Sequence, residues 1–421
     1  MNQIKQISIF LLLLLAFVGC QDKVTKELTY MANVPVYMSK EEFKSAVKKT
    51  AEQEVKEPGK IYIKDQYLFV NEVNKGIHVY NNSNPATPIY LCFINIPGNV
   101  DLAIKDNQLY ADSYIDLVVI DITDPSNPKE ISRYANAFPE IYPVYDYMYP
   151  TAPVEADKGI VVGWKVEEIT VERVDNNYFY KGGLFYTMES SSMDGAAPRG
   201  SVGKAGSMAR FAITENKLYA INRGYEIKIF DITGTQVVKS DSITSLWNIE
   251  TLFAFDNKLF IGSNNGMFIY DIRNPEKPVY ISQYNHVTSC DPVVVNGDYA
   301  FVTLRSGNNC NNVINELNVV SLADILNPKL VKAYPMFNPH GLGIDGNLLF
   351  ICDGSDGLKV YDISDVFTID QHMIKHFENI KTFDVIPFND VLIMTGSDGI
   401  YQYDYSDIQN IVEISHISIN K

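Results

Sequence analysis

The chain has 421 residues, of which 12% are aromatic, and its net charge is −16. Such acidity opposes binding to nucleic acid or to an anionic membrane surface, because both carry negative charge themselves. The basic residues are scattered along the chain, so no positive stripe is predicted and nucleic acid is excluded as a partner.

The first residues have the pattern of an export signal. Lys5 precedes an apolar run from Ile7 to Val18, too short for a span of about 20 residues, and Gly19 and Cys20 follow. A small residue before a cysteine suits lipoprotein processing, in which the thiol receives a lipid and becomes the new N-terminus. We expect residues 1–19 to be the signal peptide and Cys20 to carry lipid, with palmitate among its acyl chains. An ordinary secretory signal with an incidental cysteine is the alternative.

Four further cysteines follow. Cys92 and Cys352 lie in apolar runs, which predicts buried free thiols. Cys290 and Cys310 lie in polar surroundings, and an exported chain could join them as a disulfide. The sequence leaves that pairing open.

Residues 20–58 are predicted to form a solvated tether with one short helix. Ser39 and Glu42 have the spacing of a capping box, and Phe43 and Val47 share one helical face. A spacer between a lipid anchor and a folded domain is its simplest role.

From residue 59 onward the chain repeats one strand seven times. The copies begin at residues 77, 117, 227, 267, 317, 358 and 400, so five of the six intervals are 40 to 50 residues long. A propeller blade takes about 40 to 45 residues. Each unit also contains two preceding strands and one following strand, which predicts four antiparallel strands. We therefore expect an all-β fold, a β-propeller of seven four-stranded blades over residues 59–421, which stacks its sheets around an axis.

The clearest copy, LVVIDITDPSNP at residues 117–128, resembles the LVIVD repeat of exported bacterial and archaeal proteins. With degenerate copies, the resemblance covers nearly all of residues 59–421. It implies a propeller with a surface-binding role and carries over no catalytic residue. Asn81 and Ser321 replace the usual aspartate, so we expect altered turns in those two blades.

The one long interval contains an insertion of about 70 residues, 135–206, far more than a connection needs. Within it, residues 159–174 predict one or two strands, either as an inserted hairpin or as a degenerate eighth blade. Four tyrosines form a candidate interaction surface, since tyrosine gives amphipathic contact area at low entropic cost. The alternative is that their rings pack the inserted strand onto a blade. These residues are Tyr142, Tyr145, Tyr147 and Tyr149.

Superposing the repeats predicts a ring of polar residues at one mouth of the central channel, just before the inner strands. Such a ring could hold a polar small molecule or a peptide by convergent contacts. A solvated funnel without a ligand is the alternative. The candidate ligand-binding residues are Lys60, Asp101, Arg210, Asp291, His340 and Asp384.

Catalysis is the weaker interpretation of this ring. Its acids and His340 resemble an acid/base set, which would suit a hydrolase or lyase acting on glycan or peptide, but no serine elbow, phosphate loop or zinc signature is present. The loop from Asp353 to Gly357 lacks the spacing of a calcium-binding EF-hand. We expect no catalytic residue, no metal and no cofactor.

The favoured function is therefore that of a cell-envelope lipoprotein that acts as a non-catalytic binding or scaffold module. We expect a monomer, anchored in the outer membrane by its lipid and facing either the periplasm or the exterior. Its partner would be an envelope protein or a glycan.

Overall fold

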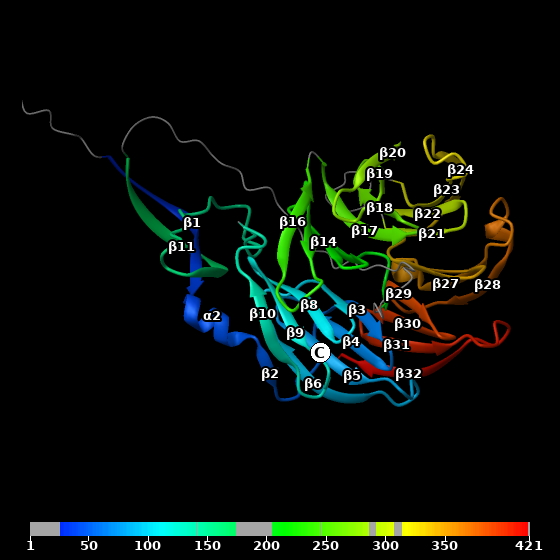
Figure 1. Cartoon of the computed structure of the whole chain (residues 1–421), viewed down its shortest axis with the longest axis horizontal. Coiled ribbons are helices and arrows are strands. Elements are labelled where there is room, and N and C mark those ends of the chain that lie inside the picture. The colour runs from blue at the N-terminus through cyan, green and yellow to red at the C-terminus, as the bar shows by residue number, and fades with distance from the viewer. Residues whose placement is uncertain are drawn as a thin grey trace, which may run out of the picture.

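The computed structural model describes residues 26–139, 141–173, 204–244, 246–285, 292–306 and 314–419. Seven antiparallel sheets follow one another around a ring, and the last sheet returns beside the first (Figure 1). The predicted seven-bladed, all-β propeller is confirmed, and the alternative of an eighth blade is wrong.

Each blade contains four strands, numbered in chain order from the inner to the outer edge. Blade 1 comprises β3 (Pro58–Lys64), β4 (Tyr67–Glu72), β5 (Gly76–Asn81) and β6 (Ile89–Asn95), and blade 2 comprises β7 (Leu102–Lys105), β8 (Gln108–Ser113), β9 (Asp116–Asp121) and β10 (Lys129–Tyr134). Blade 3 comprises β13 (Phe211–Thr214), β14 (Lys217–Asn222), β15 (Glu226–Asp231) and β16 (Val238–Ile243), and blade 4 comprises β17 (Ile249–Phe255), β18 (Lys258–Ser263), β19 (Gly266–Asp271) and β20 (Val279–Asn285).

Blade 5 comprises β21 (Val293–Asn296), β22 (Tyr299–Leu304), β23 (Glu316–Ser321) and β24 (Lys329–Pro335). Blade 6 comprises β25 (Leu342–Asp345), β26 (Leu348–Cys352), β27 (Leu358–Asp362) and β28 (Met373–Phe377), with 3₁₀ turns η1 (Gly354–Asp356) and η2 (Ile369–Gln371). Blade 7 comprises β29 (Thr382–Phe388), β30 (Val391–Gly396), β31 (Gly399–Asp404) and β32 (Val412–Ser418).

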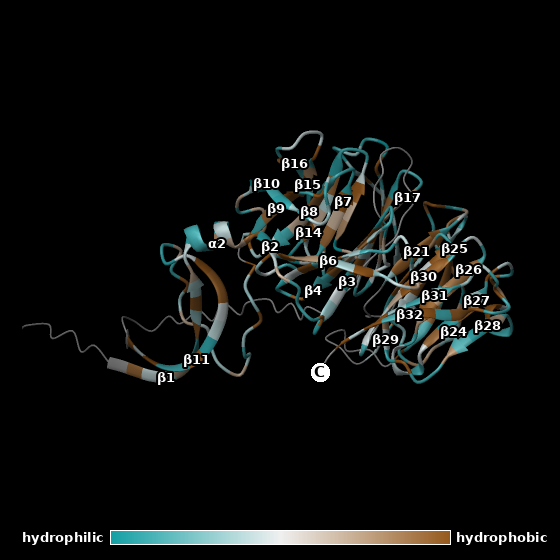
Figure 2. Ribbon diagram, turned by 90° about the horizontal axis from the view of Figure 1, so that it is seen from below, coloured by the Kyte–Doolittle hydropathy of each residue, from teal (hydrophilic) through white to brown (hydrophobic). Residues whose placement is uncertain are grey.

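The repeated segment is the third strand of each blade, which lies between two other strands and between two neighbouring blades. Its residues are therefore apolar in succession, as in β9, where every residue from Leu117 to Ile120 is fully buried. Hydrophobic residues are concentrated in the strands, and polar residues are concentrated in the loops (Figure 2).

The aspartate that ends the repeated strand fixes the turn after it. Asp121 Oδ1 accepts hydrogen bonds from the backbone N–H of Thr123 (2.9 Å) and from its hydroxyl (2.6 Å). Asn81 Oδ1 accepts from the N–H of Ser83 (3.0 Å) and Ser321 Oγ from the N–H of Ala323 (3.4 Å). The expectation of altered turns at these two positions is therefore wrong, because both side chains supply the same acceptor.

The loop after that turn also joins each blade to its predecessor. In blade 2 the carbonyl of Pro125 accepts from Cys92 in blade 1, and in blade 6 the carbonyl of Val366 accepts from Tyr334 in blade 5. The equivalent carbonyl is an acceptor at five of the seven junctions, and its donors differ in type. The other three pairs are Tyr219 to Pro275, Ser282 to Ile325 and Ser415 to Pro85.

The ring closes without a shared strand, since no blade in the described part of the chain combines strands from both ends of the propeller. At this seam Gln402 of blade 7 and Asn82 of blade 1 exchange two side-chain hydrogen bonds of 2.8 Å, and both side chains are buried. The repeat places aliphatic residues at both positions in most other blades, such as Val119 and Ile122 in blade 2.

The N-terminal segment is more structured than a tether. Its residues Lys26–Met38 form β1, which pairs antiparallel with β11 (Ile160–Arg173) of the insertion. We call this two-stranded sheet the ribbon; it projects from the propeller beside blade 2 (Figure 1). The long strand that the described part of the insertion contributes is therefore paired with the N-terminal segment and not within a hairpin of its own.

The predicted helix is confirmed as α2 (Lys40–Ala46), with the Ser39 hydroxyl accepting from the N–H of Glu42 at 3.1 Å. Phe43 is buried on blade 2 beneath the guanidinium of Arg133. After α2, β2 (Lys48–Thr50) adds to the outer edge of blade 1. No helix among the described residues is long and apolar enough to cross a membrane.

The amide pair at the seam leads to a test. We expect Gln402→Leu to lower the free energy of unfolding by about 1–3 kcal/mol, because the buried Asn82 amide loses its partner. The double variant Asn82→Ile/Gln402→Val, which adopts the side chains typical of the repeat, should recover most of this loss. Urea unfolding measures both, and purely additive effects would contradict the pairing.

Candidate functional site

The predicted polar ring is buried. Lys60 and Asp101 are each 2% exposed, Asp384 is 3% exposed and His340 is 7% exposed, whereas Arg210 is half-buried. Asp291 lies outside the described residues. The ring therefore offers little surface to solvent, and its role in ligand binding stays a prediction.

The chain itself covers these residues. The segment from Lys204 to Arg210, which we call the plug, leads from the insertion into blade 3 and begins with β12 (Lys204–Ala205), paired with β3 of blade 1. Ser207 Oγ accepts from the N–H of Leu342 in blade 6 (2.7 Å), and the carbonyl of Ala209 accepts from the N–H of Leu252 in blade 4 (2.9 Å).

Further contacts tie the plug to blades 1, 2 and 7. Lys60 Nζ donates to the carbonyl of Met208 (2.9 Å), and the N–H of Arg210 donates to Asp101 Oδ2 (2.5 Å). The Lys204 ammonium donates to the carbonyl of Pro387 in blade 7. A segment that contacts the inner strands of five blades must lie across the central channel.

Beneath the plug, Lys60, Asp101 and Asp384 form a buried charged cluster. Lys60 Nζ lies 3.4 Å from Asp101 Oδ2. Burial lowers the pKa of Lys60, and the nearby charge of Asp101 opposes this. Burial raises the pKa of Asp384 to about 7, although the N–H groups of Val385 and Ser207 and the Lys60 charge pull it down. The sequence placed these three residues together correctly.

His340 belongs to a separate group on the blade 5–6 side. Its Nδ1 lies 2.9 Å from Arg305 Nη1 and its Nε2 lies 3.3 Å from Asn338 Nδ2. Burial and the charges of Arg305 and Lys381 lower the pKa of His340 to about 3. A neutral imidazole held beside a guanidinium is a poor proton acceptor at neutral pH, so this geometry does not favour acid/base catalysis.

The loop that follows β26 is held by a lysine. Asp353 is fully buried and accepts from the N–H groups of Phe337 and Asn338 and from Lys359 Nζ, the last at 2.6 Å. Lys359 Nζ also pairs with Asp356 at 2.5 Å. An ammonium therefore occupies the place between the two carboxylates, and the described residues contain no cluster of metal-ligating side chains.

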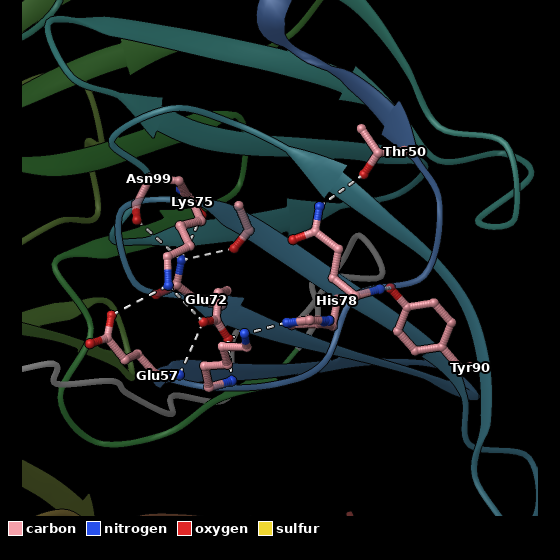
Figure 3. Close-up of polar contacts among 11 residues, drawn as sticks. Thr50, Glu57, Glu72, Lys75, His78, Tyr90 and Asn99 are labelled. Carbon is pink, nitrogen blue, oxygen red and sulfur yellow. Dashed lines mark hydrogen bonds and ion pairs between the residues drawn. The ribbon is translucent and has the colours of Figure 1, made fainter. Parts of the chain in front are cut away.

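A second buried carboxylate, which sequence reasoning missed, holds the N-terminal segment on blade 1 (Figure 3). Glu72 accepts from the N–H groups of Lys56 and Glu57 (3.0 Å each), from Lys75 Nζ (3.1 Å) and lies 3.3 Å from His78 Nε2. Burial alone would raise the pKa of Glu72, but these hydrogen bonds outweigh it and lower the pKa to about 2.

The four tyrosines lie on the ribbon and not on a blade. The rings of Tyr142 and Tyr145 meet Trp164 of β11 edge to face, with centroids 6.1 and 5.5 Å apart. Tyr147 is 75% exposed and Tyr149 is also exposed. Tyr142 and Tyr145 therefore pack onto the ribbon and not, as the alternative had it, onto a neighbouring blade, and the role of the four tyrosines as an interaction surface stays a prediction.

Some of the cysteine predictions are confirmed, and the others concern residues that the structure does not describe. Cys92 and Cys352 are buried free thiols, as expected, and burial raises the pKa of both. Cys20, Cys290 and Cys310 lie outside the described residues, so lipid attachment and the possible disulfide stay predictions.

The sequence profile of the LVIVD repeat matches residues 98–136, 254–286 and 340–366, which include the repeated strands of blades 2 and 4 and the first three strands of blade 6. The chain therefore contains LVIVD repeats. No curated protein matches it significantly.

Solved structures resemble this chain in fold. The computationally designed Ika8 protein has 12% identity and a TM-score of 0.50, covering 93% of this chain and 92% of its own. Sqt1 of Saccharomyces cerevisiae has 9% identity and a TM-score of 0.47, covering 89% and 88%, and BamB from Moraxella catarrhalis has 10% and 0.47, covering 89% and 90%. Identities this low concern the fold alone.

The plug leads to a test. A Cβ added at Gly206 would lie 2.4 Å from Asp384 Oδ2, so Gly206→Ala must displace either the plug or the buried carboxylate. We expect a loss of about 1–3 kcal/mol in thermal unfolding. Gly234→Ala is the matched control, because its nearest neighbour is 4.0 Å away. Equal effects of the two variants would show that the plug tolerates displacement.

Glu72 gives a pH-dependent prediction. Its folded pKa of about 2 lies below the ordinary value of 4.5, so its stabilising contribution is complete above about pH 4.5 and disappears as the pH falls toward 2. Glu72→Gln should therefore destabilise the protein at pH 7 and much less near pH 3. Unfolding midpoints across this range test it, with the exposed Glu57→Gln as control. A difference independent of pH would contradict the assignment.

Proposed function

We propose that this protein is a lipid-anchored, non-catalytic binding or scaffold module of the cell envelope that recognises a protein or glycan partner with its outer surface. The observation that supports this most is the plug, which lies across the channel where a propeller would otherwise receive a small ligand. Recognition then depends on the rim of the disc, its loops and the ribbon.

An exposed apolar area on blades 5, 6 and 7 suits such recognition. We call it the rim patch; it lies on the outer strands of these blades and the loops that precede them, with Leu326 66% and Phe367 55% exposed. The loop position of Leu326 and Phe367 is occupied by Ala86 in blade 1 and Ser126 in blade 2. Apolar residues gathered on neighbouring blades are typical of contact surfaces. Its members are Leu326, Leu330, Phe367, Met373, Ile408 and Val412.

The lipid anchor suits attachment to a membrane, and the rim patch suits recognition of a partner. The ribbon, which begins six residues after Cys20, and the outer strands β24 and β28 lie at opposite ends of the longest axis of the molecule (Figures 1 and 2). A lipid on Cys20 would hold the ribbon end near the outer membrane and leave the rim patch facing away from it. This arrangement supports a scaffold that displays its far rim, on either the periplasmic or the external face.

The proposal is tested by affinity capture from the native envelope with the chain that starts at Gln21. We expect to capture a partner whose binding is saturable. The double variant Leu326→Ser/Phe367→Ser should lower the affinity for this partner by about tenfold or more, because it removes two exposed apolar side chains. Val238→Ser/Val279→Ser, which removes two exposed valines from blades 3 and 4, is the matched control. Turnover of a glycan or peptide library that His340→Ala abolishes would instead establish a hydrolase.

A further inference from the structure

The tyrosine-bearing segment ends in an apolar tip. We call residues 142–150 the aromatic loop. Tyr147 and Met148 are 75% and 74% exposed at its turn, and Val144 is 63% exposed. Three large side chains are thus held in solvent within five residues, in a loop that the repeats do not require.

Hydrogen bonds from the ribbon hold the aromatic loop in place. Asn33 of β1, 1% exposed, donates through Nδ2 to the carbonyls of Asp146 and Tyr149 at 2.7 Å each, and its Oδ1 accepts from the N–H of Asp146 at 3.2 Å. Trp164 Nε1 donates to the carbonyl of Pro143 at 2.9 Å. The exposed tip is therefore presented in a fixed conformation, which lowers the cost of inserting it into another phase.

Charge is nearly absent from the loop. Asp146 is the one charged residue among the nine, and its Oδ1 accepts from the N–H of Met148 at 2.9 Å, within the turn. The whole chain, in contrast, has 20% charged residues. Tyrosines beside valine and methionine suit the boundary between lipid head groups and acyl chains, where one end of the ring is apolar and the other is wet.

The short length of chain between Cys20 and the base of the aromatic loop favours the membrane as the partner of the exposed tip. Asn33 follows Cys20 by 13 residues, and an extended chain spans at most about 3.6 Å per residue, so the base of the loop lies within about 47 Å of Cys20. The eight residues from Lys26 to Asn33 belong to one extended strand that leads directly from the anchor to the loop. A lipid on Cys20 would thus keep the aromatic loop close to the bilayer.

We propose that the aromatic loop inserts its tip, Val144, Tyr147 and Met148, into the head-group region of the bilayer that holds the lipid of Cys20. This inference rests on the lipid attachment proposed above. Because the protein carries a net charge of −16, an anionic membrane would repel it. The membrane surface that suits the loop is therefore zwitterionic, such as phosphatidylcholine or phosphatidylethanolamine. The loop would act as a second contact that orients the ribbon, and with it the propeller, relative to the membrane.

The test uses the full-length protein purified from membranes and reconstituted in phosphatidylcholine vesicles. A photo-crosslinking benzophenone residue replaces Tyr147 or, as a matched control, Tyr280, which is 53% exposed on blade 4. We expect lipid adducts at position 147 to exceed those at position 280 by about tenfold, since membrane contact is confined to the loop. The double variant Val144→Ser/Met148→Ser should reduce the adducts at position 147, whereas Leu326→Ser/Phe367→Ser should not.

The possible outcomes separate this inference from the anchor. Mass spectrometry of the N-terminal peptide reports whether Cys20 carries lipid. If it does and positions 147 and 280 label lipid equally, the loop inference is overturned and the anchor stands. If position 147 in native envelopes labels a protein and not lipid, the loop inference is likewise overturned. An unacylated Cys20 would overturn the anchor and the inference that depends on it.

Discussion

The propeller depends on how one blade is fastened to the next. Five of the seven blades present the carbonyl of their turn loop to the preceding blade, and donors as different as Cys92, Ser282 and Tyr334 bind the equivalent carbonyl. A backbone acceptor is insensitive to the side chain that carries it, so the repeats can diverge while the joint persists. This explains why the turn motif is better preserved than the outer strands, whose side chains can be exchanged as long as one donor remains.

The seam between blades 7 and 1 uses the same joint, from Ser415 to the carbonyl of Pro85, and adds a buried amide pair to it. All other junctions connect blades that follow one another in sequence, but the seam must find its partner across the whole length of the propeller. Asn82 and Gln402 satisfy each other only there, because most other blades have aliphatic residues at those positions. A buried amide left without its partner costs stability, so the pair favours contact of blade 7 with blade 1 over contact with any other blade.

Sequence reasoning found what the repeat determines and missed what depends on contacts between distant segments. Seven blades, the Ser39 cap and the proximity of Lys60, Asp101 and Asp384 all follow from periodicity or local pattern. The plug does not, since Gly206, Ser207 and Met208 resemble any small-residue linker, and their role is set by neighbours in five blades. The pairing of β1 with β11 is hidden for the same reason, because its two strands are separated by more than 100 residues.

The plug also explains how so long an insertion can be tolerated. Phe138 anchors its beginning, packed against Phe211 and Phe230 with ring centroids 5.9 and 6.2 Å apart, and the plug anchors its end. Both ends of the insertion are therefore part of the core, which fixes where the inserted segment leaves and rejoins the propeller. Buried charges secure the second anchor, since Lys60 and Asp101 would be costly to bury without Met208 and Arg210 as partners. The channel residues Lys60 and Asp101 thus hold the end of the insertion in place.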